Sequence, residues 1–343
     1  MAFTKIDIHS VEGFAIGNAE NIDAATGCTC IICKEGAVAG VDVRGGAPAT
    51  TDTELLKSEN NVEIVNAVVL SGGSAFGLEA VSGVRRELAE SGIGYKVKGT
   101  DINVPIVVGA SLFDLNIGKS DTFPDVLMGR QACRSAFAGR FETGNHGAGT
   151  GATVGKFCGS HRAMKAGIGA FACGDEHLQI GAIAAVNAAG DIYDGANNII
   201  AGVTNDRGTA VEGCIRTLKK AVHNETVKDT REEVIRKFRA MGYDIPLNTT
   251  ISCVITNAKL SKPQANKLAS ILHDAYARAI KPVHSTLDGD TVFVMASGKQ
   301  EVNFDAFAAL ATDILQYSII DAALSAEEAY GLKSAQSFKQ EHK

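Results

Sequence analysis

The hydrophobic positions along this 343-residue chain fall mostly into short runs that suit β-strands. Each run is rich in Val, Ile or Ala and is bounded by Gly, Asn or Asp, which favour turns. Several runs lack polar alternation, so we expect these strands to be buried on both faces, between two layers. The expected strands are 28–33, 37–43, 64–70, 104–108, 166–172, 180–187, 251–256 and 291–296.

Two longer segments have helical periodicity instead. Over 261–280, Ser261 and Gln264 have the spacing of a capping box, and apolar residues then recur at helical intervals. A second helix is expected over 303–330, where apolar residues keep the same rhythm. We expect both helices to cover one face of a sheet that contains the last two strands.

Strands and helices alternate without an internal repeat or a linker rich in Pro, Gly or Ser, which favours a single α/β domain over residues 1–343. A hydrophobic content of 45% is enough for a sizeable core. The net charge of −6 lacks the basic character that nucleic acid or an anionic membrane requires. Neither a secretory leader nor an apolar stretch of membrane-spanning length is recognisable, so we expect a cytoplasmic protein.

Eight cysteines are scattered along the chain, and Cys30 and Cys33 have a spacing seen in redox and zinc sites. Both lie in an expected strand, followed by an expected turn at 34–36, and residues three apart on a strand point to opposite faces. A second Cys or His pair is not found near them in the sequence. We therefore expect reduced, mostly buried thiols, with no metal and no cofactor.

Two glycine-rich segments have compositions suited to close contact with a ligand. Segment 144–152 lacks the glycine spacing of a dinucleotide site. Segment 71–77 lacks the Gly-Lys-Ser/Thr ending of a phosphate loop, and Ser74 is expected to cap the helix that follows. Neither segment indicates a nucleotide.

Asn248-Thr249-Thr250 places a threonine at the start of the expected strand 251–256. If the Thr249 hydroxyl attacked the carbonyl of Asn248 and the ester hydrolysed, Thr249 would become a new N-terminus whose own amine serves as the base. The same residues also suit an ordinary turn into a strand. The polar segment 223–236 before them fits a processing region, and equally a plain surface helix.

Four further polar residues are candidates for chemistry. Asp288 and Asp290 stand two residues apart before an expected strand, where a carboxylate could orient a nucleophile, although a plain turn gives the same pattern. Lys165 and Asn187 lie among small apolar residues, where a buried polar side chain needs a partner. A buried Lys could stabilise charge and an Asn amide could donate to an oxyanion, while surface exposure and a turn are the simpler alternatives.

Motifs spread over nearly the whole chain resemble the β-aminopeptidases of the D-aminopeptidase/esterase type and the endo-type nylon-oligomer hydrolases. So many long matches in one order make the resemblance specific. The matching segments are 27–29, 36–48, 70–78, 105–107, 147–152, 164–169, 248–251, 282–284 and 288–293.

This resemblance implies an N-terminal-nucleophile-like fold, a four-layer αββα sandwich. It also implies autocleavage into an α-chain of residues 1–248 and a β-chain of residues 249–343, and assembly of these αβ units into homo-oligomers, often tetramers. The implied substrates are short peptides, β-peptides or ω-amino-acid oligomers of the 6-aminohexanoate type.

The resemblance also implies roles for individual residues. Thr249 is the implied nucleophile, Asn187 the oxyanion donor and Lys165 an assistant near the nucleophile. Asp288 and Asp290 match an acidic pair implicated in maturation and in holding the nucleophile. The Thr nucleophile and the Asp-Gly-Asp pattern are nearer to the nylon-oligomer hydrolase branch than to the β-aminopeptidases that use Ser. The expected substrate pocket includes Gly147, Gly149, Gly151 and Ser74.

Two alternatives to this hydrolase stay open on the sequence. Self-cleaving threonine proteins of similar architecture include acyltransferases, which pass the acyl group to an amine instead of water. A small-molecule-binding relative that never matures would keep the fold without the cleavage.

Overall fold

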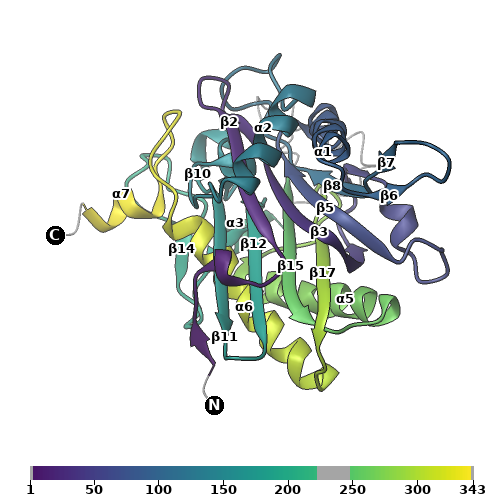
Figure 1. The fold of residues 1–343 in the computed structure, drawn as a ribbon. Helices are drawn as coiled ribbons and strands as arrows, with labels where there is room; N and C mark the ends of the chain where they lie inside the picture. Colours follow the sequence, from purple (N-terminus) through teal and green to yellow (C-terminus); the bar gives the residue numbers. More distant parts are fainter. Residues whose placement is uncertain (1–2, 222–247, 341–343) are drawn as a thin grey trace.

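The computed structural model describes residues 3–221 and 248–340. Within these residues the main sheet has ten strands: β1 (Thr4–Lys5), β2 (Ala15–Asn21), β3 (Thr26–Val43), β4 (Thr50–Thr51), β5 (Ile64–Ser71), β8 (Val107–Ser111), β11 (Ile168–Gly174), β12 (Gln179–Asn187), β15 (Thr249–Ala258) and β17 (Thr291–Gln300). Their order is β1-β11-β12-β15-β17-β3-β5-β8-β4, with β2 beside β3 (Figure 1). The β15–β17 and β5–β8 pairs are parallel, and the other pairs are antiparallel.

A single strand, β3, connects the two layers of this sheet and is 18 residues long. Its first half pairs with β2 and β5, and its second half pairs with β17. The register with β5 shifts between Ile32 and Ala37, and Gly36 has a φ of 85°. The expected turn at 34–36 between two separate strands is therefore wrong. The segment is a bulge, which bends one continuous strand from the first layer into the second.

Three apolar cores separate four layers. The central core lies between the two halves of the sheet and joins residues such as Ile31 from one half to Phe293 from the other. One outer core lies under α1 and α2, and the other lies under α5 and α6. The helices are α1 (Glu79–Glu90), α2 (Val126–Phe137), α5 (Lys262–Ala279) and α6 (Phe304–Leu324). This succession of helix, sheet, sheet and helix layers confirms the expected αββα architecture.

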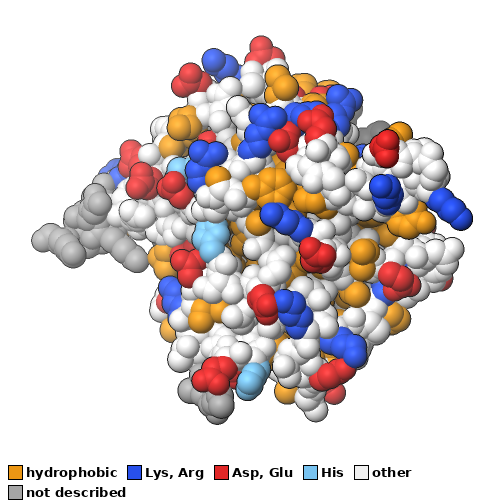
Figure 2. All heavy atoms as spheres, viewed as in Figure 1, with side chains coloured by type: hydrophobic (Ala, Val, Ile, Leu, Met, Phe, Trp, Pro, Cys, Tyr) orange, Lys and Arg blue, Asp and Glu red, His pale blue; other side chains and the backbone are white. Residues whose placement is uncertain are grey.

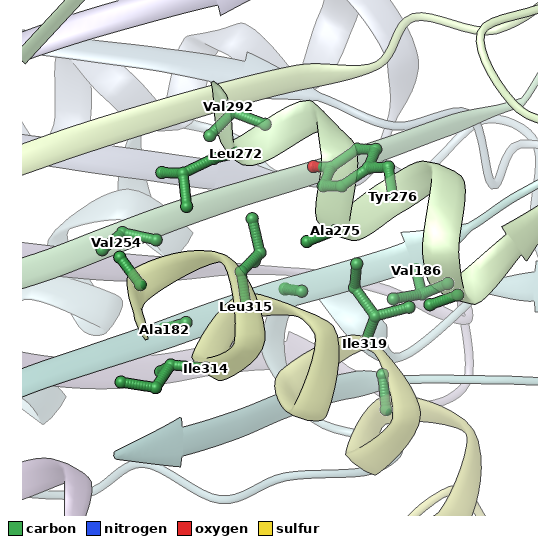
Figure 3. Close-up of a cluster of buried hydrophobic side chains, with 14 of the residues drawn as sticks. Ala182, Val186, Val254, Leu272, Ala275, Tyr276, Val292, Ile314, Leu315 and Ile319 are labelled. Carbon is green, nitrogen blue, oxygen red and sulfur yellow. The ribbon is translucent and has the colours of Figure 1, made fainter. Parts of the chain in front are cut away.

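The helices α5 and α6 cover the sheet that contains β15 and β17, as expected. Figure 3 shows part of this core, where Leu272 and Tyr276 of α5 and Leu315 of α6 lie among Val254 and Val292 of the sheet. Helical spacing puts these residues on one face of each helix, so the apolar stripe read from the sequence is the buried one.

The capping box of α5 is present, because Ser261 N–H donates to Gln264 Oε1 at 2.9 Å and the Ser261 hydroxyl accepts from the Gln264 backbone. The other long helix ends at Leu324, so its expected end at 330 is wrong. Beyond it the backbone of Tyr330 has a φ of 56°, and the Tyr330 hydroxyl donates to the carbonyl of Ile22 at 2.8 Å. After α6 the chain thus contacts the residue that follows β2 instead of continuing as a helix.

By length and composition, α6 is apolar enough to cross a membrane, with a mean hydropathy of 1.3. This corrects the expectation that no segment of the chain has that character. In the folded protein 56% of the segment is buried, and residues such as Ile314 and Ile319 pack against the sheet. Burial of this kind is typical of a core helix, which is apolar on most sides.

The expected strand 104–108 is divided at Pro105, which has no backbone N–H to donate. Ile106 N–H instead donates to the Asn66 side chain at 3.0 Å. The remaining expected strands are observed, with ends that differ by a few residues. The smaller elements are β6 (Tyr95–Lys96), β7 (Asn103–Val104), β9 (Thr153–Val154), β10 (Met164–Lys165), β13 (Asp191–Tyr193), β14 (Ile199–Ala201), β16 (Ile280–Lys281), α3 (Cys214–Ala221) and α7 (Ala335–Gln340).

Cys30 and Cys33 point to opposite faces of β3, as their spacing predicts. Cys30 belongs to the core under α1 and α2, and Cys33 belongs to the central core. All eight cysteines are free thiols.

Acidic and basic side chains are interspersed on the face of the molecule seen in Figure 2. Between α1 and α2, Arg130 pairs with Glu87 at 3.0 Å, and Arg134 pairs with the same carboxylate at 2.7 Å. The charges on these helices are therefore neutralised locally and do not form a patch of one sign.

Candidate active site

Thr249 is the first residue of β15, in the middle of the main sheet. It pairs with Asn187, the last residue of β12, on one side. The preceding residue, Asn248, bridges to Asp288, which comes just before β17. Only 4% of Thr249 is exposed. The strand pairing therefore brings Asn187 and Asp288, which are about 100 residues apart, to opposite sides of one peptide bond.

The carbonyl oxygen of Asn248 has two donors close to it. The Thr249 hydroxyl lies 2.5 Å from this oxygen, and Gly289 N–H donates to it at 2.9 Å. A backbone N–H aimed at a carbonyl stabilises the negative charge that the oxygen acquires when the carbonyl carbon is attacked. A hydroxyl, a carbonyl and a backbone N–H donor therefore meet at the bond between Asn248 and Thr249.

Gly289 permits this approach because it has no side chain. A Cβ at this position would lie 2.6 Å from the Thr249 hydroxyl oxygen. Gly45 has a similar part in the facing loop, where a Cβ would lie 2.3 Å from the Asp288 carbonyl oxygen. That loop binds the acidic segment through Ala47 N–H, which donates to the same carbonyl at 2.8 Å. These two glycines allow backbones distant in sequence to close around the site.

Asp288 and Asp290 are both buried beside the Asn248-Thr249 bond, but they have different partners. Asp290 accepts the N–H of Thr250 at 2.8 Å, and Asp288 accepts the N–H of Ser285 at 2.7 Å. Burial, with the nearby charge of Asp290, raises the pKa of Asp288 to about 6. In this chain Asp290 thus holds the residue after the expected nucleophile, and its hydrogen bonds do not include the Thr249 hydroxyl.

Asn187 is buried, and both ends of its amide are engaged. Its oxygen accepts from Lys156 Nζ at 2.7 Å and from Thr153 N–H at 3.1 Å. Its nitrogen donates to the carbonyl of Phe113 at 2.8 Å. The expected oxyanion donor is therefore next to Thr249 in the sheet, with its N–H group directed at another carbonyl.

Lys165 is fully buried in β10. Its ammonium group donates to the carbonyls of Gly149 at 3.0 Å, Ala152 at 3.1 Å and Ala166. Burial lowers the pKa of Lys165 to about 7. Two of these acceptors belong to the glycine-rich segment 144–152, and the third is the residue after Lys165. Lys165 therefore holds this segment in place rather than contacting Thr249 directly.

Lys156 is a site residue that the sequence analysis missed. It donates to the side chain of Asn187 at 2.7 Å and to the carbonyl of the same residue at 3.1 Å. Burial lowers the pKa of Lys156 to about 7, against the opposing charges of Asp288 and Asp114. Its sequence context, Val-Gly-Lys-Phe-Cys, is that of an ordinary loop. The tertiary structure is needed to see that Lys156 binds Asn187, the residue that pairs with Thr249 across the sheet.

Asp114 was also missed. Its carboxylate accepts from the Thr26 hydroxyl at 2.8 Å and from Gly73 N–H at 2.7 Å. Burial raises the pKa of Asp114 to about 6, although both hydrogen bonds and Lys156 favour its charged form. Asp114 and Asp288 thus have raised pKa values and Lys156 and Lys165 lowered ones, and such shifts are frequent at functional sites.

The expected pocket glycines make close backbone contacts. A Cβ would lie 2.0 Å from the Ala25 carbonyl oxygen at Gly151, 2.1 Å from Ile168 N at Gly149, and 2.3 Å from the Thr29 hydroxyl at Gly147. All three glycines are buried, so close packing accounts for each of them.

The expected helix cap at Ser74 is wrong. Ser74 has a φ of 55° and begins a short 3₁₀ helix over Ser74–Leu78, and the cap of α1 is Leu78. A serine in the left-handed region cannot take the extended conformation of an N-cap. The polar segment 223–236, expected to be a processing region or a surface helix, lies outside the described residues.

Comparisons with known sequences show the family to which this chain belongs. Residues 7–337 match the profile of peptidase family S58. An uncharacterised aminopeptidase of Mycobacterium leprae is 32% identical over 97% of this chain and 94% of the relative. A 6-aminohexanoate-oligomer endohydrolase of Kocuria sp. is 28% identical over 91% of this chain and 84% of the relative.

Solved structures share the fold at lower identity. The L-aminopeptidase D-Ala-esterase/amidase of Ochrobactrum anthropi, described as a variant of the N-terminal-nucleophile hydrolase fold, aligns with a TM-score of 0.66 at 16% identity, covering 96% of this chain and 91% of that one. A Burkholderia sp. β-aminopeptidase aligns with a TM-score of 0.65 at 18% identity, covering 99% and 95%. The chain thus has an N-terminal-nucleophile hydrolase fold, belongs to peptidase family S58 and is a hydrolase of peptide or amide bonds.

Proposed function

We propose that this chain is a precursor that cuts itself between Asn248 and Thr249 and then hydrolyses amides with Thr249 as its N-terminal nucleophile. The observation that carries the proposal is the Thr249 hydroxyl 2.5 Å from the Asn248 carbonyl oxygen, with Gly289 N–H donating to the same oxygen. The hydroxyl is therefore held next to the carbonyl group that it would attack.

The cleavage follows from this arrangement in two steps. First, Thr249 Oγ1 bonds to the Asn248 carbonyl carbon, Gly289 N–H stabilises the oxyanion, and the C–N bond breaks as the nitrogen takes up a proton. The product is an ester with a free amine on Thr249. Water then hydrolyses the ester, which leaves a carboxylate on Asn248 and restores the Thr249 hydroxyl.

In the mature enzyme, the amine of Thr249 takes the proton from its own hydroxyl, and the alkoxide attacks a substrate amide. An acyl-enzyme forms, the amine product leaves, and water releases the acid. We assign oxyanion stabilisation to Asn187 and nearby backbone N–H groups, which requires the Asn187 amide to release the Phe113 carbonyl after cleavage. Lys156 donates to the oxygen end of this amide and is suited to keep the Asn187 side chain in position while its nitrogen end changes partner.

The proposed substrates are short peptides, β-peptides and ω-amino-acid oligomers. Support comes from the relatives, which include an aminopeptidase and a 6-aminohexanoate-oligomer endohydrolase at 32% and 28% identity. A dipeptide amide, a β-dipeptide and a 6-aminohexanoate trimer therefore form the first panel. Product analysis with and without an added amine distinguishes hydrolysis from acyl transfer.

The test is the intact mass of purified protein under denaturing conditions. We expect two fragments, of residues 1–248 and 249–343, for the natural chain, and one uncut chain without hydrolase activity for Thr249→Ala. Thr249→Ser keeps a hydroxyl and is expected to cleave. Cleavage of Thr249→Ala at this bond would refute the proposed nucleophile.

A further inference from the structure

A chain of hydrogen-bonded groups leads from the edge of α5 to the strand of the expected nucleophile. His273 Nε2 lies 3.1 Å from the Asp42 carbonyl oxygen, and His273 Nδ1 lies 3.2 Å from His284 Nε2. His284 Nδ1 lies 2.8 Å from one oxygen of Asp290, whose other oxygen accepts Thr250 N–H at 2.8 Å. The proposed cleavage and hydrolysis assign no role to either histidine.

The partners of His273 determine where its proton lies. The Asp42 carbonyl can only accept, so His273 Nε2 carries a hydrogen and donates it. His273 is completely buried, and this burial lowers its pKa to about 4, so the ring is neutral at pH 7. Its Nδ1 then holds a lone pair, and His284 Nε2 must be the donor across the 3.2 Å contact.

The other nitrogen of His284 faces a carboxylate. Asp290 accepts backbone N–H groups from Thr250 at 2.8 Å and from His284 at 3.2 Å, so both of its oxygens act as acceptors. His284 Nδ1 must therefore also donate, across 2.8 Å. These two contacts together call for a hydrogen on each nitrogen of the His284 ring.

The position of this ring is imposed by its contacts and not by its own backbone preference. His284 has a φ of 55°, a left-handed conformation that is unfavourable for most residues other than Gly and Asn. The Tyr276 ring stacks on it with centroids 5.8 Å apart. Strain of this kind persists where the surroundings over-determine a residue, and it often marks a functional position.

We propose that His284 is a positioning residue, whose doubly protonated ring ties Asp290 to His273 and so holds the start of β15 in register for cleavage before Thr249. The inference rests on the proposed cleavage between Asn248 and Thr249. The titratable groups that contact the His284 ring are Asp290 on its own segment and His273 and Tyr276 on α5. Asp42 and Arg44, on or next to β3, lie beside His273, and Asp288 accepts the N–H of Ser285, the residue after His284.

The first variant is His284→Asn, because asparagine accepts the left-handed backbone but is too short to join His273 to Asp290. Loss of a charge-assisted hydrogen bond predicts precursor cleavage that is about 10-fold to 100-fold slower at pH 7. His9→Asn, at an exposed histidine, is the matched control and is expected to cleave at the natural rate. A melting temperature equal to that of the control separates positioning from general loss of structure.

A matched pair at His273 tests the chain itself. His273→Asn keeps an acceptor close to the position of Nδ1, whereas His273→Leu removes it. We expect the leucine variant to cleave as slowly as His284→Asn, and the asparagine variant to recover most of the rate. Equal rates for the two variants would contradict a role for the hydrogen bond to His284.

Nitrogen-15 NMR of histidine-labelled Thr249→Ala protein reads the protonation state without activity. We expect both ring nitrogens of His284 to be protonated at pH 7.5, with signals assigned by their loss in the His284→Asn background. A neutral His284 ring, or cleavage of His284→Asn at the natural rate, overturns the inference. If Thr249→Ala itself is cut, the proposed cleavage fails, which is a distinguishable result.

Discussion

Single residues at this site owe their chemistry to burial. Lys156 and Lys165 are each enclosed by the protein, and in both cases burial lowers the pKa to about 7. Their partners separate their roles, since Lys156 donates to Asn187 beside Thr249 and Lys165 donates to carbonyls of the glycine-rich segment. The two lysines thus have similar pKa values but different partners, and Lys156 is the one that contacts the residue paired with Thr249.

Lys156→Met is therefore expected to slow hydrolysis about 100-fold, the size of effect seen when a group that orients or protonates at a reacting centre is removed. Lys165→Met, its matched control, is expected to affect stability more than rate. Measurements of kcat/KM and of melting temperature on both variants check this assignment. A larger loss of kcat/KM in Lys165→Met would reverse the two roles.

Gly289→Ala adds a single methyl group, which would lie 2.6 Å from the Thr249 hydroxyl oxygen. We expect this displacement to slow precursor cleavage about 100-fold, as misplacement by about 1 Å does at reacting centres. The time course of fragment appearance on denaturing gels provides the measurement. Gly195→Ala, where a Cβ meets nothing within 4 Å, is the control and should cleave normally.

At the scale of elements, the bulge in β3 and the helix α5 supply the framework of the site. The bulge bends β3 from one layer of the sheet into the other. The loop after β3, which contains Gly45, then packs against the backbone of Asp288. The α5 helix contributes His273 and Tyr276 from its buried face. The cap of α5 lies at the opposite end of the helix, so stability and site geometry can be tested separately.

Ser261→Ala removes the cap of α5 and is expected to lower the free energy of unfolding by about 1 kcal/mol. Urea unfolding measures this change. Because the capping hydroxyl is more than ten residues from His273 along the helix, the extent of precursor cleavage should stay unchanged. A cleavage defect in Ser261→Ala would mean that α5 controls the site as a whole.

At the scale of the whole molecule, the buried lysines make stability depend on pH. An unfolded lysine has a pKa of about 10.4, whereas burial lowers the pKa of Lys156 and Lys165 to about 7. Above pH 7 the unfolded chain binds more protons than the folded chain, so the free energy of unfolding rises with pH. Buried thiols with raised pKa values, such as Cys253, act in the opposite direction at higher pH.

We therefore expect uncleaved Thr249→Ala protein to become more stable between pH 7 and pH 8.5, as measured by urea unfolding. Addition of Lys165→Met should flatten the slope, because one of the two titrating amines is gone. A free energy of unfolding that falls over this range in the parent protein would show that the lysines remain charged in the folded state.

Much of the fold and part of the site could be predicted from the sequence. The capping box at Ser261 and the apolar runs of β12, β15 and β17 are local patterns, and they identified the elements that carry Asn187 and Thr249. The end of α6 could not be read locally, because the contact of Tyr330 with Ile22 joins residues about 300 positions apart. Lys156 and Asp114 were missed for the same reason, since a loop lysine and a loop aspartate look exposed in the sequence.

The sequence by itself determined most of the strands, the long helices and the capping box of α5, because periodicity and capping depend on neighbours along the chain. The four-layer architecture and the choice of Thr249 as the expected nucleophile came from the resemblance of its motifs to a known family. The tertiary structure alone decided which charges are buried and what they contact. It placed Lys156 on Asn187, Lys165 on the glycine-rich segment and His284 between His273 and Asp290. Desolvation and hydrogen bonding depend on groups brought together from distant strands, and no local pattern encodes them.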